Sequence, residues 1–213
     1  LSVSDGTEAD SQAFTIAVAN TNDAPSFTSD APTSASEDDL YSYLVEVADM
    51  DTTDTVSLIA TTLPNWLSFD SATSTLSGTP LNQHVGDHPV VLSVSDGTEA
   101  DSQAFTITVA NTNDAPSISG SANLSVLQDQ LYRFVPKSTD IDKNDRLTFT
   151  IINKPLWATF DVSNGELKGI PNNNHVGEYP NIVISVTDHS IEMPISLSSF
   201  SIRVININDS PII

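Results

Sequence analysis

The chain has 213 residues, no cysteine and a formal net charge of −21, and these features exclude several classes of protein. Without cysteine there is neither a disulfide framework nor thiol chemistry. No run of 18 apolar residues predicts a membrane span and no signal peptide is recognisable, so we expect any export signal to lie outside this sequence. All seven basic residues lie beyond residue 132, which makes nucleic acid and anionic membranes poor partners.

Internal repeats divide the chain. Residues 1–25 and 92–116 have the same sequence except for Ala17 in place of Thr108, and a diverged third copy, FSIRVININDSP, occupies residues 200–211. The repeated prolines at 25, 116 and 211 are 91 and 95 residues apart, about the size of one β-sandwich module. We therefore predict the last two strands and linker of a preceding repeat over 1–23, repeat 1 over 24–114 and repeat 2 over 115–213.

The first predicted element is a hairpin over residues 1–19, the last two strands of a repeat whose other strands it lacks. An isolated hairpin is marginal in water. It cannot replace the matching strands of repeat 1 in its own chain, because the six linker residues reach about 20 Å while the poles of a sandwich lie about 27 Å apart. We expect this hairpin to be loosely ordered or docked on a neighbouring chain, with a concentration-dependent dimer.

Alternating apolar and polar residues, bounded by Pro, Gly, Asn and Asp, predict half-buried strands through both repeats. No segment reads as a helix. In repeat 1 the apolar positions are Tyr41, Tyr43, Val45, Val47; Val56, Leu58, Ala60; Leu67, Phe69; Val90, Leu92, Val94; and Phe105, Ile107, Val109. In repeat 2 they are Tyr132, Phe134; Leu147, Phe149, Ile151; Phe160; Ile182, Ile184, Val186; and Phe200, Ile202, Val204. The predicted fold is all-β, with tandem immunoglobulin-like (cadherin-like) β-sandwiches of about seven strands each.

Aspartates recur at equivalent positions of the two repeats. The aligned sets are Asp49, Asp51 and Asp96 in repeat 1, and Asp140, Asp142 and Asp188 in repeat 2. Residues i and i+2 of a strand face the same side, so each Asp-x-Asp pair presents two carboxylates together. Such a pair needs a counter-charge, and residues 1–132 contain neither Lys nor Arg.

In a sandwich the second and sixth strands end at the pole that faces the preceding linker. We therefore expect the first set to lie beside Asn20 and Asp23, and the second beside Asn111 and Asp114. Six to eight oxygen ligands suit Ca²⁺ better than water-rich Mg²⁺, and Zn²⁺ prefers His or Cys. The alternative is that these aspartates cap turns in an acidic protein, a role that fits the aligned Asp54 and Asp145 better than metal binding.

The pattern ADMD…LPNWLSFDSATSTLSGTP…HVGDHPVVLSVSDG…FTITVANTNDAP, echoed as TDID…KPLWATFDVSNGELKGIP…HVGEYP…ISVTD…INDSP, resembles the dystroglycan-type cadherin-like repeat of large bacterial surface and secreted proteins. The resemblance covers both repeats and the first hairpin. It implies a seven-stranded cadherin-like sandwich, Ca²⁺ at the junctions, and a role in adhesion or in spacing apart the parts of an extracellular protein.

Carried over by position, the resemblance implies that the Asp-x-Asp pairs, Asp96 and Asp188 bind the ion, together with Asn111, Asn113 through its backbone, and Asp114. Glu37 matches the acidic residue contributed by the start of the preceding repeat, but repeat 2 has Gln128 there. The DRE motif of animal cadherins is missing, with Asn82 and Gln83 nearest to it. These departures favour one or two ions per junction over three.

Other residues point to function less specifically. Trp66 and Trp157 are each followed three residues later by a core-type Phe, so packing is favoured over contact with a sugar. His84 and His88 lie in a turn, where their spacing does not form a zinc site. No carboxylate pair or nucleophile is singled out for catalysis, so we predict that the chain is not an enzyme.

Two functions remain open. The first is a Ca²⁺-rigidified spacer or adhesion module at the bacterial cell surface, whose partners are neighbouring repeats of the same array. The second is a module that itself binds polysaccharide or like repeats on another cell, with the help of Ca²⁺. A glycan array with and without Ca²⁺ distinguishes the two.

Overall fold

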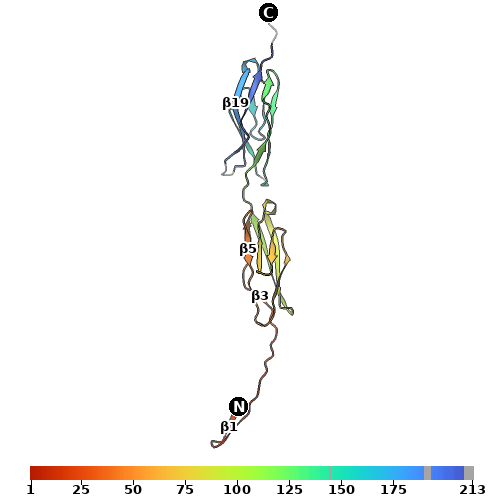
Figure 1. Cartoon of the computed structure of the whole chain (residues 1–213), viewed down its shortest axis with the longest axis vertical. Coiled ribbons are helices and arrows are strands. Elements are labelled where there is room, and N and C mark those ends of the chain that lie inside the picture. Colours follow the sequence, from red (N-terminus) through yellow and green to blue (C-terminus); the bar gives the residue numbers. More distant parts are fainter. Residues whose placement is uncertain (144, 190–192, 209–213) are drawn as a thin grey trace. The chain divides into compact units, whose positions relative to one another are not determined.

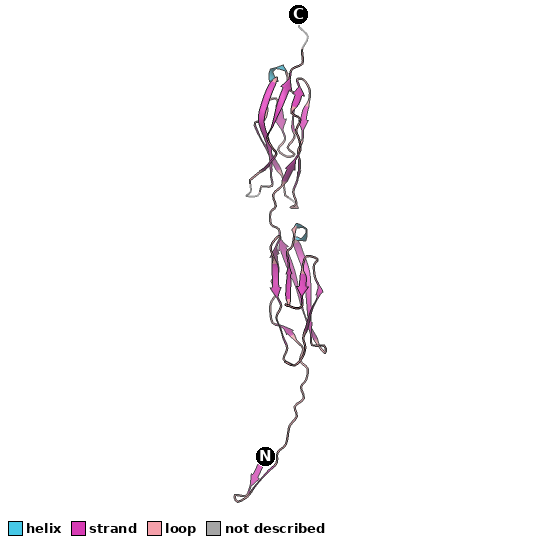
Figure 2. Ribbon diagram, in the orientation of Figure 1, coloured by secondary structure: helices cyan, strands magenta, loops and turns pink. Residues whose placement is uncertain are grey.

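The computed structural model describes residues 1–143, 145–189 and 193–208; Asp209 to Pro211, which end the third linker motif, lie outside this part. The chain divides into two compact units, Leu1–Ala110 and Asn111–Ile213 (Figure 1). Regular structure in the described residues is β-strand throughout, apart from two short 3₁₀ turns, Asn82–His84 (η1) and Asn173–His175 (η2) (Figure 2). The predicted all-β fold is confirmed. None of the described helices is long and apolar enough to cross a membrane.

Repeat 1 is a sandwich of two main sheets. One sheet has the order β4-β11-β10-β7, and the other has the order β5-β9-β8, with β3 paired to β6 beside them. The bounds are β3 Ser26–Phe27, β4 Ser34–Ser36, β5 Tyr41–Leu44, β6 Val47–Ala48, β7 Ser57–Thr62, β8 Ser68–Asp70, β9 Thr75–Gly78, β10 Gly86–Ser95 and β11 Ala100–Ala110. Strand β4 is parallel to β11, and the other pairs are antiparallel.

Repeat 2 has the same arrangement. Its sheets have the orders β13-β21-β19-β16 and β14-β18-β17, β12 pairs with β15, and a short extra strand β20 pairs with β19. The bounds are β12 Ser117–Ser119, β13 Ser125–Leu127, β14 Tyr132–Phe134, β15 Lys137–Thr139, β16 Thr148–Ile152, β17 Ala158–Phe160, β18 Leu167–Gly169, β19 Gly177–Thr187, β20 Ile195–Ser196 and β21 Phe200–Ile205. Among the strands that the structure describes in repeat 2, the β13–β21 pair is parallel and the other pairs are antiparallel.

The core lies between the two sheets of each sandwich. Val90, Leu92 and Val94 alternate along β10 and are fully buried, because successive residues of a strand face opposite sides. Strands β9 and β18 were not predicted, yet Leu76 and Leu167 in them are fully buried. Each of these short strands carries a single large apolar residue, so no alternation is visible in the sequence.

Residues 1–19 begin with the hairpin β1 (Ser2–Ser4) and β2 (Ala9–Ser11), and the residues after Ser11 form no strand. Every residue from 1 to 21 is exposed. The expected docking on a neighbouring chain stays a prediction.

Candidate metal centre

Three hydrogen bonds tie the first linker to the end of repeat 1. The backbone N–H of Asp23 donates to Oδ2 of Asp51 over 2.7 Å, and the side-chain amide of Asn22 donates to Oδ2 of Asp96 over 3.0 Å. The backbone N–H of Asp51 donates to Oδ1 of Asp49 over 2.8 Å. Because Asn22 and Asp23 are adjacent, the carboxylates of Asp51 and Asp96 lie at the same pole.

The second linker repeats this arrangement at repeat 2. Asp114 donates its backbone N–H to Oδ2 of Asp142 over 2.6 Å, and the amide of Asn113 donates to Oδ2 of Asp188 over 3.0 Å. The N–H of Asp142 donates to Oδ1 of Asp140 over 3.0 Å. The same three bonds in two diverged repeats mark a structural motif that a scatter of exposed acidic residues would not produce.

The strand ends explain why these side chains meet. Asp49 and Asp140 directly follow β6 and β15, while Asp96 and Asp188 directly follow β10 and β19. In each Asp-x-Asp pair the first carboxylate accepts the N–H two residues later, a local turn that aspartate forms readily. The second aspartate of each pair, Asp51 or Asp142, is buried.

One carboxylate oxygen in each repeat lacks a hydrogen-bond donor. Oδ2 of Asp49 and Oδ2 of Asp140 are buried, and no group among the described residues donates to either of them. Burying a charged oxygen without a partner is costly, and most buried polar atoms in proteins are satisfied. The same atom is left over at equivalent positions of both repeats, and a cation is the partner that would satisfy it.

Asp145 adds a further carboxylate in repeat 2. One ligand atom each from Asp140, Asp142 and Asp145 lie within 4.8 Å of one another. Desolvation, followed by repulsion from Asp140, Asp142 and Asp188, raises the pKa of Asp145 above its ordinary value of 3.8. Asp145 was expected to serve a turn, and the structure also places its carboxylate beside those of Asp140 and Asp142. The backbone N–H of its counterpart Asp54 donates to the Asp51 carbonyl over 2.9 Å, as a turn residue does.

The linker asparagines also contact the site through their side chains. The expectation that Asn113 binds the ion through its backbone stays a prediction, and its side-chain amide donates to Asp188. Asn22, its counterpart, was missed, although aligning the two linkers would have found it. Asn20 donates its amide to Oδ1 of Asp51, which places it at the site, and Asn111 is exposed at the start of its linker.

Glu37 lies at the other pole of repeat 1. It directly follows β4, it is 2% exposed, and its N–H donates to the carbonyl of Ala110 at the end of β11. The pairing of β10 with β11 puts Ala110 and Asp96 at opposite ends of the sheet. Gln128 is equally buried in repeat 2 and accepts a hydrogen bond from the N–H of Ile207.

The hydrogen bonds around Asp96 favour its ionised form. Hydrogen bonds from the backbone N–H groups of Glu99 and Thr98, and then from the Asn22 amide, lower the pKa of Asp96 below 3.8. The Oδ1 atom of Asp96 accepts the two backbone bonds, and its Oδ2 atom faces the linker. The carboxylate is therefore charged at neutral pH and turned toward the site.

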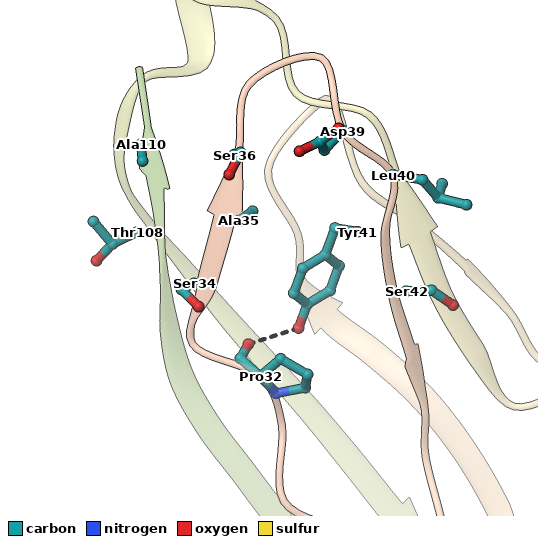
Figure 3. Close-up of a pocket in the computed structure, with 10 residues that line it drawn as sticks. All are labelled: Pro32, Ser34, Ala35, Ser36, Asp39, Leu40, Tyr41, Ser42, Thr108 and Ala110. Atoms are coloured by element: carbon teal, nitrogen blue, oxygen red, sulfur yellow. Dashed lines mark hydrogen bonds between the residues drawn. The ribbon is translucent and has the colours of Figure 1, made fainter. Parts of the chain in front are cut away.

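The tryptophans pack inside the sandwiches, as predicted. Trp66 and Trp157 are each 9% exposed, and each ring meets a tyrosine edge-on, Tyr41 or Tyr132. They therefore present no face for stacking on a sugar. A surface pocket of about 480 Å³ lies next to Tyr41, between β4 and β5 (Figure 3). The Tyr41 hydroxyl donates to the carbonyl of Pro32 there over 2.8 Å, and its ring is buried.

The histidines hold turns together. Nδ1 of His84 accepts the N–H of Leu81 over 2.9 Å, and Nε2 of His88 donates to the carbonyl of His84 over 2.6 Å. In repeat 2, Nδ1 of His175 likewise accepts the N–H of Asn172 over 3.0 Å. These ring nitrogens therefore have structural partners in the turns.

The family model described as "Putative Ig domain" matches residues 24–110 and 115–204, which are the two sandwiches. The chain belongs to this Ig-domain family. Membership agrees with the tandem sandwich fold and with the junction position of the linkers, since the residues between the two matches are the second linker.

One curated relative and two solved structures show further similarities. The chain is 31% identical over 122 residues to the "Serine-rich adhesin for platelets" of Staphylococcus aureus strain MRSA252, which covers 57% of this chain and 9% of the adhesin. The aligned part is thus a small fraction of that relative. Among solved structures, PcdhgB3 EC1-4 has a TM-score of 0.64 at 20% identity, covering 90% of this chain and 52% of that one. The protocadherin GammaB4 extracellular domain has a TM-score of 0.61 at 20% identity, covering 91% and 34%. These structures show a cadherin-like fold.

Proposed function

We propose that each repeat binds Ca²⁺ at the pole that faces its preceding linker, and that the chain is a calcium-stiffened spacer or adhesion module of a large bacterial surface protein. The observation that carries this proposal is the buried, unpartnered oxygen of Asp49 and of Asp140. A divalent cation supplies the missing partner and offsets the repulsion within each carboxylate set.

The donor set supports Ca²⁺ in particular. The proposed ligands are Asp49, Asp51, Asp96, Asn20 and Asp23 for repeat 1, and Asp140, Asp142, Asp188, Asn111, Asn113 and Asp114 for repeat 2. All offer oxygen atoms, the ligands that Ca²⁺ prefers. Asn22 and Asp145 are added on the geometry described above.

Stiffening follows from where the ligands lie. Asn113 and Asp114 belong to the linker, whereas Asp142 and Asp188 belong to the sandwich that follows it. An ion bound by both groups would fix the linker to that sandwich, and its loss would leave clustered carboxylates that repel one another. This mechanism suits a module that holds a binding domain away from the cell surface.

The adhesion role is supported by the matched relative, which is named as an adhesin, and by the cadherin-like fold. We also propose that the two repeats are of the dystroglycan type that their sequence resembles. A sugar-binding role has less support, because both tryptophans are buried.

Isothermal titration with Ca²⁺, combined with thermal unfolding, tests the proposal. We expect saturable binding and a rise in melting temperature, since a ligand at 100 times its dissociation constant stabilises the folded state by about 2.7 kcal/mol. Asp140→Asn should remove binding at repeat 2, and Asp49→Asn should remove it at repeat 1. Glu178→Gln, on the exposed face of β19, makes the same charge change away from the site and should leave binding intact. Absence of heat and of stabilisation at millimolar Ca²⁺ would exclude the site.

A further inference from the structure

The carboxylate sets of the two repeats share one plan but differ in one member. In repeat 2, ligand atoms of Asp140, Asp142 and Asp145 lie within 4.8 Å of one another. The structure describes the whole corresponding turn of repeat 1, and the equivalent aspartates there form no such group. Repeat 2 therefore gathers one carboxylate more at its linker pole than repeat 1 does.

Asp54 shows where this difference arises. Its backbone N–H donates to the carbonyl of Asp51 over 2.9 Å, and the residue is exposed. Its counterpart Asp145 is half-buried. The same loop position thus carries an exposed carboxylate in repeat 1 and a carboxylate close to the Asp-x-Asp pair in repeat 2.

An amide donor in repeat 1 is the second difference. The side chain of Asn20 donates to Oδ1 of Asp51, and the backbone N–H of Asp23 donates to Oδ2 of the same carboxylate. A cation at Oδ1 would have to displace the Asn20 amide or turn it so that its oxygen faces the ion. The described residues of repeat 2 contain no equivalent bond from Asn111.

Basic side chains do not cancel the extra charge of repeat 2 by direct contact. Lys143 and Arg146 flank Asp145 in the sequence. The two ion pairs among the described residues are both made by Glu166, which lies on the sheet β14-β18-β17 side of the sandwich. Neither of the flanking cations is therefore paired with the carboxylates of the site.

We propose that the two calcium sites fill in order, and that the site of repeat 2 binds Ca²⁺ more tightly than the site of repeat 1. This inference rests on the proposed function, because it takes both poles to bind the ion. The affinity of an oxygen-ligated site for Ca²⁺ rises with the number of charged ligands, and Asp145 supplies one more. Displacement of the Asn20 amide lowers the affinity of repeat 1 further.

Ordered filling makes the stiffness of the chain depend on the Ca²⁺ concentration in two steps. Between the two dissociation constants, the second linker is fixed to the sandwich that follows it while the first linker is not. The chain then has one stiffened linker, and it gains the other only at higher Ca²⁺.

Variants with a single working site separate the two affinities. Asp140→Asn leaves the site of repeat 1, and Asp49→Asn leaves the site of repeat 2. Calorimetric titration of each variant with Ca²⁺ measures the two dissociation constants. We expect the site of repeat 2 to bind at least about tenfold more tightly. In the unmodified chain, limited proteolysis followed by mass spectrometry should show residues 111–116 protected at lower Ca²⁺ than residues 20–25.

Exchange of the turn aspartates tests the cause. Asp145→Asn in the Asp49→Asn background should weaken binding about tenfold, because the site loses one charged ligand. Asp54→Asn in the Asp140→Asn background is the matched control, and it should leave binding unchanged because Asp54 is exposed. Thermal unfolding in EDTA shows whether each variant is folded.

Equal dissociation constants, or tighter binding at repeat 1, would overturn the inference and leave the proposed function intact. A loss of affinity with Asp54→Asn as large as that with Asp145→Asn would also overturn it. If a variant fails to fold, the proteolysis of the unmodified chain decides, and protection of both linkers at the same Ca²⁺ concentration would overturn the inference. Absence of Ca²⁺ binding by both single-site variants would overturn the proposed function, and this inference with it.

Discussion

The backbone N–H of Asp114 donates to the buried carboxylate of Asp142, which joins the second linker to the end of β15. Asp23 and Asp51 make the same bond in the first linker. The aspartate that we propose as a metal ligand therefore also positions the linker before any ion binds.

Loss of this hydrogen bond should lower the stability of repeat 2 even when no metal ion is bound. Asp142→Ala should destabilise repeat 2 by about 1–3 kcal/mol in the presence of chelator, because the Asp114 N–H loses its acceptor. Asp142→Asn retains an acceptor oxygen and should cost less. Urea unfolding in EDTA measures both, with Glu178→Ala as the exposed control. Equal stability of the alanine variant and the parent would contradict the linking role.

Asp145 should affect stability in opposite directions with and without Ca²⁺. Desolvation and its acidic neighbours raise the pKa of Asp145 above 3.8 in the folded state. Its contribution to folding stability is therefore fully present below pH 3.8, and it is lost as the pH rises through the folded-state pKa. Asp145→Asn should therefore raise the melting temperature at neutral pH in EDTA, and this difference should vanish in acid. Addition of Ca²⁺ should raise the melting temperature of the variant by less than it raises that of the parent. A variant that is less stable than the parent in EDTA would refute this prediction.

Two glycines should be irreplaceable for steric reasons. A Cβ on Gly78 would lie 2.1 Å from the carbonyl oxygen of Trp66, and one on Gly169 would lie 2.4 Å from that of Trp157. Both atoms belong to backbone, which cannot move aside as a flexible side chain can. Gly78→Ala or Gly169→Ala should lower the free energy of unfolding by about 3 kcal/mol or more, measured by denaturant unfolding. Thr150→Ala, on an exposed strand face, should change it little.

Two of the four tyrosines should ionise late. Burial raises the pKa of Tyr41 to about 12, with a further contribution from Tyr43, and burial alone raises that of Tyr132 to about 12. Since these folded-state values exceed the ordinary value of 10.0, their contribution to stability is present below pH 10 and lost as the pH rises toward 12. Ultraviolet titration of phenolate should show this delayed phase, and Tyr41→Phe with Tyr132→Phe should remove it.

Sequence alone determined the repeat period, the all-β class and which aspartates are equivalent. These properties follow from the order and spacing of the residues. Apolar residues from Val90 to Val94 alternate with a period of two, and the sequence duplication aligns Asp49 with Asp140. It also predicted that the Asp-x-Asp pairs would lie near the linkers, because a sandwich fixes the pole at which each strand ends.

Tertiary structure decided which atoms meet. Leu76 and Leu167 lie in strands too short to show a pattern, and only pairing with their neighbours makes them core residues. Asn22 reaches Asp96 across 74 residues, and Asp145 joins the carboxylates of Asp140 and Asp142, because folding brings separate strand ends to one pole. The clearest case is Ile16 and Ile107, which have the same local sequence and opposite exposure. Burial depends on the partner surface that a segment meets, and that surface is not contained in the segment itself.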